Sequence, residues 1–292
     1  MMTASAFARL VRLPAALTAP GDTLAGAAAA GWPFGARTAL LPLSSTLIYW
    51  AGMALNDYAD RDLDAIERPE RPIPAGDVTP VEALAVAIVL TSAGVGIATL
   101  AGGRRGLAVA LPLAASVWAY DVVFKPTALG PVSMATTRLL DVLLGAGAGS
   151  WRRALPAALT VFTHTLGTTT LSRDEVHGSR SAVVGTLAVT GTACAAVAAA
   201  AGPTLNPANG WLPRVAGAAL ALAYLAAVAP AQVVARRTRA APDIRRAVGA
   251  SVMGTTGLQA ALIARSGAVG TGLALAALLP LGRRLTRRVS AT

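Results

Sequence analysis

The chain has 292 residues and a net charge of +11, yet only 13% of its residues are charged and 54% are hydrophobic. Several windows of about 17 to 22 residues carry no charge, and such stretches cross a bilayer as helices because every backbone polar group must be paired internally. This composition excludes a soluble or secreted protein. The arginines are scattered at predicted helix ends, so we expect a lipid bilayer as partner and no nucleic acid.

In chain order, the apolar windows predict helices at residues 8–29, 36–58, 80–101, 105–124, 131–149, 154–173, 181–201, 212–236, 247–264 and 267–283. The last two windows also fit one span followed by an interfacial helix. We therefore expect an all-α, polytopic membrane bundle of nine or ten transmembrane helices around a central cavity, in one domain over residues 1–292. The excess of arginine on the side of the N-terminus predicts that this side is cytoplasmic.

One stretch, from Asn56 to Gly76, interrupts the apolar pattern with four aspartates, two glutamates and three arginines. Asn56, Asp60 and Asp64 recur every four residues, so they share one face of a helix. Three oxygen ligands at this spacing suit a magnesium ion that carries a diphosphate. A solvated helix cap is the simpler alternative, but four aspartates within eight residues repel one another unless cations neutralise them.

The other charged residues of this stretch have separate interpretations. Asp57 and Asp62 point to other helix faces and are interpreted as solvated or as paired with Arg61. Arg68 and Arg71 follow closely, and their planar guanidinium groups could grip phosphate oxygens.

A second polar segment, residues 172–180, follows the sixth predicted helix, four helices after the first segment. This spacing suggests two related halves that bring their polar ends together over one cavity. On the assigned topology, both segments lie on the cytoplasmic side.

These residues carry a resemblance to a known family. Asn56-Asp-x-x-Asp60-x-x-x-Asp64, followed by Arg-Pro-x-Arg-Pro-Ile-Pro-x-Gly, resembles the first aspartate-rich motif of the UbiA superfamily of intramembrane prenyltransferases. A second match begins at Tyr120-Asp-x-x-x-Lys125 and resembles the family segment whose lysine helps to hold the diphosphate. The resemblance extends from Pro20 to at least Leu187 and looks closest to the EboC-like branch.

The second aspartate-rich motif of the family departs from its usual pattern in this chain. Ser172, Glu175 and Ser179 stand where the family usually has three aspartates. Only Glu175 keeps a carboxylate, with Asp174 as a neighbour outside the register. A second magnesium ion would therefore have fewer charged ligands here.

The resemblance implies Mg²⁺-dependent transfer of a prenyl group from an isoprenoid diphosphate to an unidentified acceptor, through diphosphate departure and an allylic cation. It implies an integral, multi-pass membrane enzyme with its active site toward the cytoplasm. The implied catalytic residues are Asp60, Asp64, Glu175 and Lys125. The implied metal ligands are Asn56, Asp60, Asp64, Asp174 and Glu175. The implied substrate-binding residues are Arg68, Arg71, Tyr120, Lys125, Arg138, Asp141, His177 and Asp22.

Several of these residues have a second interpretation. Arg138 and Asp141 lie three positions apart, so they either line the cavity or neutralise each other. Tyr120 either lines the pocket or anchors the interface, and His177 either serves the acceptor or caps a helix. Asp22 and His164 are interpreted as facing the cavity.

Two other functions stay open. One is a terpene cyclase on the same scaffold, which an aromatic content of only 4% disfavours because cyclases steady cations on aromatic faces. The other is a non-catalytic protein that binds or helps to transport isoprenoid lipids. Prenyl chain length, acceptor and oligomeric state are not specified by the sequence.

Overall fold

The computed structural model describes residues 2–13, 20–31, 36–147, 149–203 and 210–278, and these residues form helices without any strand. The helices are α1 (Ala4–Leu10), α2 (Pro20–Ala30), α3 (Ala36–Ala59), α4 (Arg61–Glu67), α5 (Pro80–Ala119), the π-helical turn η2 (Tyr120–Phe124), α6 (Gly130–Gly145), α7 (Trp151–Ser172), α8 (Ala182–Ala201), α9 (Leu212–Thr238), α10 (Ala241–Arg265) and α11 (Val269–Ala277).

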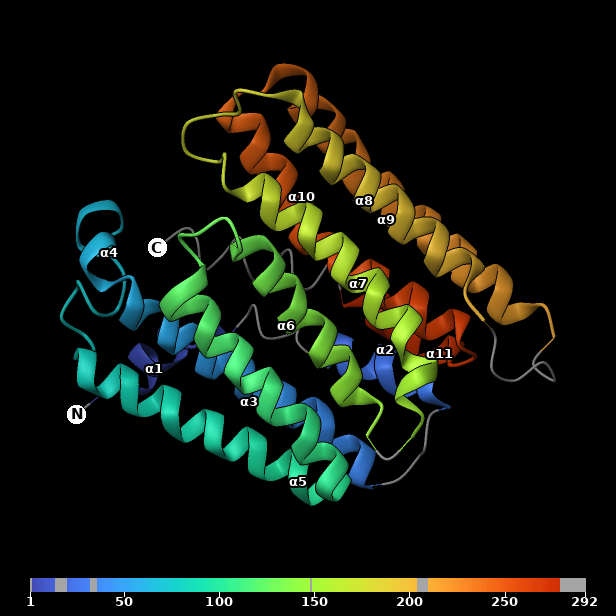
Figure 1. The fold of residues 1–292 in the computed structure, drawn as a ribbon, viewed down its shortest axis with the longest axis horizontal. Helices are drawn as coiled ribbons and strands as arrows, with labels where there is room; N and C mark the ends of the chain where they lie inside the picture. Colours follow the sequence, from blue (N-terminus) through green and yellow to red (C-terminus); the bar gives the residue numbers. More distant parts are fainter. Residues whose placement is uncertain (1, 14–19, 32–35, 148, 204–209, 279–292) are drawn as a thin grey trace.

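The long helices run side by side in two groups (Figure 1). In one group α3 packs on α5, and in the other α7, α8, α9 and α10 pack against their neighbours. The helices α2 and α6 join the groups, since α6 contacts α5 and α7 while α2 contacts α6, α7 and α10. The predicted all-helical bundle is therefore confirmed for the described residues.

The predicted break between helices 80–101 and 105–124 falls inside α5. There Gly103 has φ 58° and ψ −140°, a backbone conformation that a side chain would strain and that separates two helices. The start of α5 is fixed by a capping box, in which Thr79 and Glu82 satisfy each other's backbone N–H groups.

Two predicted helices differ most from the structure. The helix predicted at 247–264 starts six residues earlier, at Ala241, because Pro242 occupies its first turn, where proline is tolerated. The helix predicted at 8–29 corresponds to the short α1 and to α2, and residues 14–19 between them lie outside the described residues. The predicted segment 267–283 also extends beyond the described part of the chain.

Four described segments are long and apolar enough, by length and composition, to cross a membrane: Pro80–Phe124, Ala182–Ala201, Leu212–Thr238 and Ala241–Arg265. The helices α3 and α7 are also long enough, with 24 and 22 residues, but they carry many of the polar residues that face the cavity described below. The count of nine or ten spans stays a prediction.

The core that α2 and α6 share with α7, α8, α9 and α10 is rich in alanine, which lets these helices approach closely. The closest approach is between α2 and α6. A Cβ atom added to Gly26 would lie 1.8 Å from the carbonyl oxygen of Val142, and one added to Gly145 would lie 2.0 Å from that of Thr23. At both positions, therefore, only glycine fits without movement of a backbone.

Candidate active site

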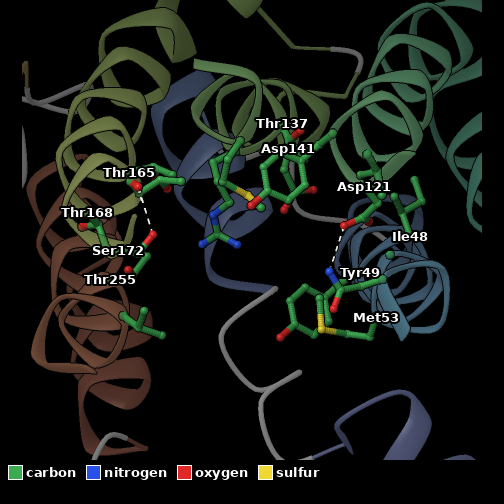
Figure 2. Close-up of a pocket in the computed structure, with 18 of the residues that line it drawn as sticks. Ile48, Tyr49, Met53, Asp121, Thr137, Asp141, Thr165, Thr168, Ser172 and Thr255 are labelled. Carbon is green, nitrogen blue, oxygen red and sulfur yellow. Dashed lines mark hydrogen bonds between the residues drawn. The ribbon is translucent and has the colours of Figure 1, made fainter. Parts of the chain in front are cut away.

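A cavity of about 440 Å³ lies between the two groups of helices. Its walls come from α3, α5 with η2, α6, α7 and α10, and Arg12 also lines it. In Figure 2, Ile48, Tyr49, Met53 and Asp121 lie on one side of the opening, and Thr165, Thr168, Ser172 and Thr255 lie on the other. Both polar segments of the sequence reach this cavity, through Asn56 and through Ser172 and Glu175.

The first segment keeps its four-residue spacing across a break in the helix. α3 ends at Ala59 and α4 starts at Arg61, yet the N–H groups of Asp60 and Asp64 still donate to the carbonyl oxygens four residues earlier, at 2.9 and 2.8 Å. The break therefore bends the chain without losing the helical register.

Asn56 and Asp60 belong to a group that we call the α3–η2 cluster, made up of Asn56, Asp60, Asp121 and Lys125. The Nδ2 of Asn56 donates to Oδ1 of Asp121 at 3.1 Å, and the ammonium group of Lys125 forms an ion pair with Asp60. The π-helical turn η2 sets the spacing of Asp121 and Lys125, and such turns occur often at functional sites. The cluster thus gathers two carboxylates, an amide and a cation at one edge of the cavity.

Asp57 is not solvated and does not pair with Arg61, so that interpretation was wrong. Its side chain is 1% exposed and accepts hydrogen bonds from Arg12 at 2.8 Å and from Arg71 at 2.6 Å. Arg61 instead lies 3.6 Å from the exposed Asp62. The burial of Asp57 is possible because two guanidinium groups supply the partners that water would otherwise provide.

Arg12 is a cavity residue that the predicted site did not include. It follows α1 with φ 49°, in the left-handed region, and also donates to Oδ1 of Asn56 at 3.1 Å. A single arginine 44 residues before its partner gives no periodic signal, so sequence reasoning had no means of placing it there.

Asp64 lies away from the cavity lining and is 1% exposed. Its nearest cation is Arg68, whose Nη1 is 3.6 Å from Oδ1, and neither of its carboxylate oxygens accepts a hydrogen bond among the described residues. A buried carboxylate in this condition is costly, so it favours a nearby cation.

The second polar segment contributes fewer residues than the first. Ser172 and Glu175 line the cavity, Asp174 is half-buried, and His177 is exposed. Ser179 donates to the carbonyl oxygen of Ser181 at 2.8 Å.

Glu175 lies in a partly buried position at the end of this segment. Burial raises the pKa of the Glu175 carboxyl above its ordinary value, and the nearby charges of Arg245 and Arg68 partly oppose the rise. Arg245 also donates to the backbone carbonyl of Glu175 at 2.9 Å, which fixes this loop against α10.

Deeper in the cavity, Arg138 does not pair with Asp141, its neighbour three residues on. The Nε of Arg138 lies 2.9 Å from Oδ2 of Asp22, and Gln259 donates to the other oxygen of Asp22 at 2.7 Å. Asp141 instead accepts a hydrogen bond from Ser45 at 2.8 Å. Arg138 and Asp141 both line the cavity, whereas Asp22 is fully buried behind the lining, so its predicted cavity-facing position was wrong.

His164 lines the cavity as expected, but its two ring nitrogens are already engaged. Nε2 lies 3.1 Å from the carbonyl oxygen of Ser251, which can only accept, so Nε2 carries the proton. Nδ1 must then accept from the hydroxyl of Tyr224, at 2.7 Å. His164 therefore links α7, α9 and α10 through its hydrogen bonds. It has no lone pair left to take a proton from a substrate.

The donor set of the α3–η2 cluster fits magnesium that is shared with a diphosphate. Among the described residues, no group of three or more His, Cys, Asp or Glu side chains is placed to hold a metal alone. Magnesium usually binds to one or two carboxylates together with substrate phosphates. The cluster supplies ligands of this type: the carboxylates of Asp60 and Asp121 and the amide oxygen of Asn56. The unpaired buried oxygens of Asp64 add a carboxylate that a cation would stabilise.

Asp121 joins Arg12 among the residues that the predicted site omitted. It stands inside the Tyr120–Lys125 motif, and it is buried at the cavity edge with its side chain bonded to Asn56. Its place in that motif was the available signal. Tyr120 lines the pocket, so the cavity position holds for this residue.

Comparison with known proteins agrees with this architecture. The family described as the UbiA prenyltransferase family matches residues 16–252. The digeranylgeranylglyceryl phosphate synthase of Ignicoccus hospitalis is 32% identical over 232 residues, which cover 76% of this chain and 72% of that protein. The 4-hydroxybenzoate octaprenyltransferase of Janthinobacterium sp. (strain Marseille) is 48% identical over 63 residues, or 21% of this chain and 22% of that one.

Other curated relatives match over a shorter region. The digeranylgeranylglyceryl phosphate synthase of Natronomonas pharaonis is 38% identical over 117 residues, and the match covers 40% of this chain and 42% of that protein. The chain thus spans less than half the length of several relatives that it matches. These relatives do not test the predicted placement in the EboC-like branch.

Two solved structures share the fold. The apo structure of a UbiA homolog from Aeropyrum pernix has a TM-score of 0.65 at 19% identity and covers 85% of this chain and 96% of that chain. A UbiA homolog from Archaeoglobus fulgidus bound to GPP and Mg²⁺ has a TM-score of 0.54 at 14% identity and covers 90% and 99%. With the family match over most of its length, the chain belongs to the UbiA prenyltransferase family.

Proposed function

We propose that this protein transfers a prenyl group from an isoprenoid diphosphate to an acceptor within the membrane, with Mg²⁺ as cofactor. The observation that carries the proposal is the α3–η2 cluster at the edge of a cavity that has one largely apolar wall and that Glu175 also lines. The named activities of the relatives and the GPP and Mg²⁺ bound to one structural neighbour support it.

The diphosphate would bind at the α3–η2 cluster. Lys125 would exchange its contact with Asp60 for the leaving group, and Arg68 would add charge from the exposed side. Arg71 already neutralises Asp57, so its contribution would be to hold α4 and α3 together as much as to contact phosphate. These cations stabilise the negative charge that grows on the diphosphate as the carbon–oxygen bond breaks.

Two sets of ligands would hold the metal. We assign Asn56, Asp60 and Asp64, together with Asp121 of the same cluster, to one Mg²⁺, and Glu175 with Asp174 to a second. When bound, Mg²⁺ would supply Lewis-acid stabilisation of the departing diphosphate. The second set is the weaker one because it offers fewer ligand side chains than the first.

The cavity wall below the cluster would protect the allylic cation from water. Ile48 and Met53 on α3, Leu113 and Val117 on α5 and Met134 on α6 present apolar side chains to it. Contact between an isoprenoid tail and these side chains would stabilise the bound donor by about 25 cal/mol per Å² of apolar area removed from water. The acceptor would then attack the cationic carbon of the prenyl group. We place the reaction on the cytoplasmic side, as the distribution of arginines suggests.

The test uses the purified full chain with radiolabelled geranylgeranyl diphosphate and a lipid extract as the source of acceptors. We expect Mg²⁺-dependent release of diphosphate and a labelled lipid product, both abolished by EDTA and by Asp60→Ala. Asp62→Ala is the matched control, since its side chain is 88% exposed and lies outside the cavity. Release that persists in Asp60→Ala would refute the metal assignment, and the absence of any release would favour a non-catalytic lipid-binding protein.

The same assay separates transfer from cyclisation. A cyclic hydrocarbon formed without added acceptor would indicate a terpene cyclase. The described cavity lining offers a cation only two phenol rings, Tyr49 and Tyr120, besides the engaged His164. This sparse aromatic lining favours transfer to an acceptor.

A further inference from the structure

The cavity has two chemically different walls. The wall formed by α3 and α5 is largely apolar, whereas every cavity-lining residue on α7 is polar: His164, Thr165, Thr168, Thr169 and Ser172. Thr255 on α10 continues the same surface, and Figure 2 shows it beside Thr165, Thr168 and Ser172. We call the surface made by Thr165, Thr168, Thr169, Ser172 and Thr255 the hydroxyl wall. A hydrocarbon tail would leave the hydroxyl groups of this surface without hydrogen-bond partners, so the wall points to a polar ligand.

Three of the five side chains in this wall already use their hydroxyl protons within their own helices. Thr168 donates to the carbonyl oxygen of His164 at 2.9 Å, Ser172 donates to that of Thr169 at 2.9 Å, and Thr255 donates to that of Ser251 at 3.2 Å. The Thr255 oxygen also accepts from Nε2 of His164 at 3.2 Å, which leaves at least one oxygen lone pair on each of these three side chains for a ligand. A surface of this kind accepts hydrogen bonds and recognises O–H or N–H groups.

The carboxylate of Asp141, in the same cavity, would also bind a ligand that donates hydrogen bonds. Asp141 is 7% exposed and lines the cavity, and its Oδ1 accepts no hydrogen bond among the described residues. A buried acceptor without a partner costs free energy that a ligand hydroxyl would recover. This atom is a second, independent indication of a ligand that donates hydrogen bonds.

The charges around the hydroxyl wall disfavour an acidic ligand. Arg138 is the cation nearest to Asp141 in sequence, and its Nε is paired with Asp22 at 2.9 Å. Glu175 adds a carboxylate where the wall reaches the cavity edge. An incoming carboxylate or phosphate would meet the Asp141 carboxylate and a guanidinium group whose charge Asp22 already neutralises.

We propose that the hydroxyl wall, together with Asp141, is the acceptor subsite, and that the acceptor it fits is an uncharged compound bearing hydroxyl groups. This inference rests on the proposed prenyl transfer and adds the chemical class of the second substrate. The isoprenoid tail then lies against the α3 and α5 wall, and the two substrates meet along the length of the cavity.

The test compares two probes of nearly equal size, 4-hydroxybenzyl alcohol and 4-hydroxybenzoate, which differ in a hydroxymethyl group and a carboxylate. Binding to the purified full chain in nanodiscs is measured by calorimetry in the presence of Mg²⁺ and geranylgeranyl diphosphate. We expect the alcohol to bind about tenfold more tightly than the benzoate, as one or two hydrogen bonds imply.

Variants then identify the surface. The double variant Thr168→Val and Thr255→Val keeps the side-chain shape and should weaken binding of the alcohol about tenfold. Thr163→Val is the matched control, because Thr163 lies on the same helix outside the cavity lining and bonds only its own helix, to the carbonyl oxygen of Leu159 at 2.9 Å. Unchanged affinity for geranylgeranyl diphosphate in each variant shows that the fold and the donor site are intact.

Three results would overturn the inference: no binding of the alcohol, equal or tighter binding of the benzoate, or unchanged affinity for the alcohol in the double variant. Tight binding of the benzoate that Arg138→Gln abolishes would identify an anion site in its place. The proposed function fails separately, through donor binding or diphosphate release that does not depend on Asp60.

Discussion

Replacement of Asp22 by alanine should destabilise the protein strongly, although Asp22 lies outside the cavity. Its carboxylate is fully buried between the Nε of Arg138, at 2.9 Å, and the amide of Gln259, at 2.7 Å. Removing it leaves a cation without its partner inside the membrane domain and an amide without its acceptor.

The expected magnitude follows from these contacts. Breaking a buried ion pair by removal of one partner costs about 3 to 5 kcal/mol, because the remaining charge is left uncompensated. The lost hydrogen bond to Gln259 adds about 1 kcal/mol. The Arg138 side chain is 15% exposed and lines the cavity, where water can partly solvate it, so we expect the lower half of the ion-pair range, about 3 to 4 kcal/mol. With the lost hydrogen bond, the expected total is about 4 to 5 kcal/mol.

The assay is the free energy of unfolding in mixed detergent micelles, with a double-mutant cycle. The double variant Asp22→Ala with Arg138→Met should recover at least about 1 kcal/mol relative to the sum of the single variants, since no buried charge remains. Asp243→Ala is the control, because its partner Arg246 is 71% exposed and such a pair contributes at most about 1 kcal/mol. A loss in Asp22→Ala no larger than in Asp243→Ala, or strict additivity in the cycle, would refute the reasoning.

Three further predictions concern the site. Lys125→Met should weaken binding of geranylgeranyl diphosphate at least about tenfold, measured by calorimetry, because one charge-assisted contact is lost; unchanged affinity would remove Lys125 from the donor site. Since burial raises the pKa of Glu175, its carboxylate form is lost at a higher pH than for an exposed glutamate. The Mg²⁺-dependent rate should therefore begin to fall on acidification at a higher pH than an exposed glutamate would cause. Glu175→Gln should lower the rate and remove this pH dependence. An unchanged pH–rate profile in the variant would contradict this prediction. Tyr224→Phe leaves Nδ1 of His164 without its donor and should lower the free energy of unfolding by about 1 to 3 kcal/mol with the chemistry intact, whereas a selective loss of rate would show that His164 takes part in catalysis.

Much of the fold followed from the sequence because the bilayer imposes a strong constraint on it. An apolar run must be a helix in a membrane, so the windows located the long helices and even the break at Gly103. The start of α10 was harder to place, since arginines before residue 247 indicated a loop while Pro242 permitted a first helical turn. Charge marks exposure to water in such a chain, but it does not mark the end of a helix.

The partners of the charged residues were less predictable. The spacing of Arg138 and Asp141 suggested a local pair, but the actual partner, Asp22, lies on another helix. Asp57 appeared solvated because its partner Arg12 is far away in sequence and Arg71 lies beyond the next helix. Helical spacing predicts which residues share a face, whereas the identity of the facing residues depends on packing between elements. One sequence carries no direct record of that packing.

The contact between α2 and α6 has a mechanical consequence for the cavity. At Gly26 and Gly145 one backbone lies directly on the other, with no side chain between them that could change rotamer. Neither helix can slide or turn against the other without a clash of main-chain atoms, so the two helices should move as one rigid body. Room for substrates of different size must therefore come from displacement of α7 and α10 or of α3 and α5. Conformational adaptation is thereby confined to the two walls that contact the substrates.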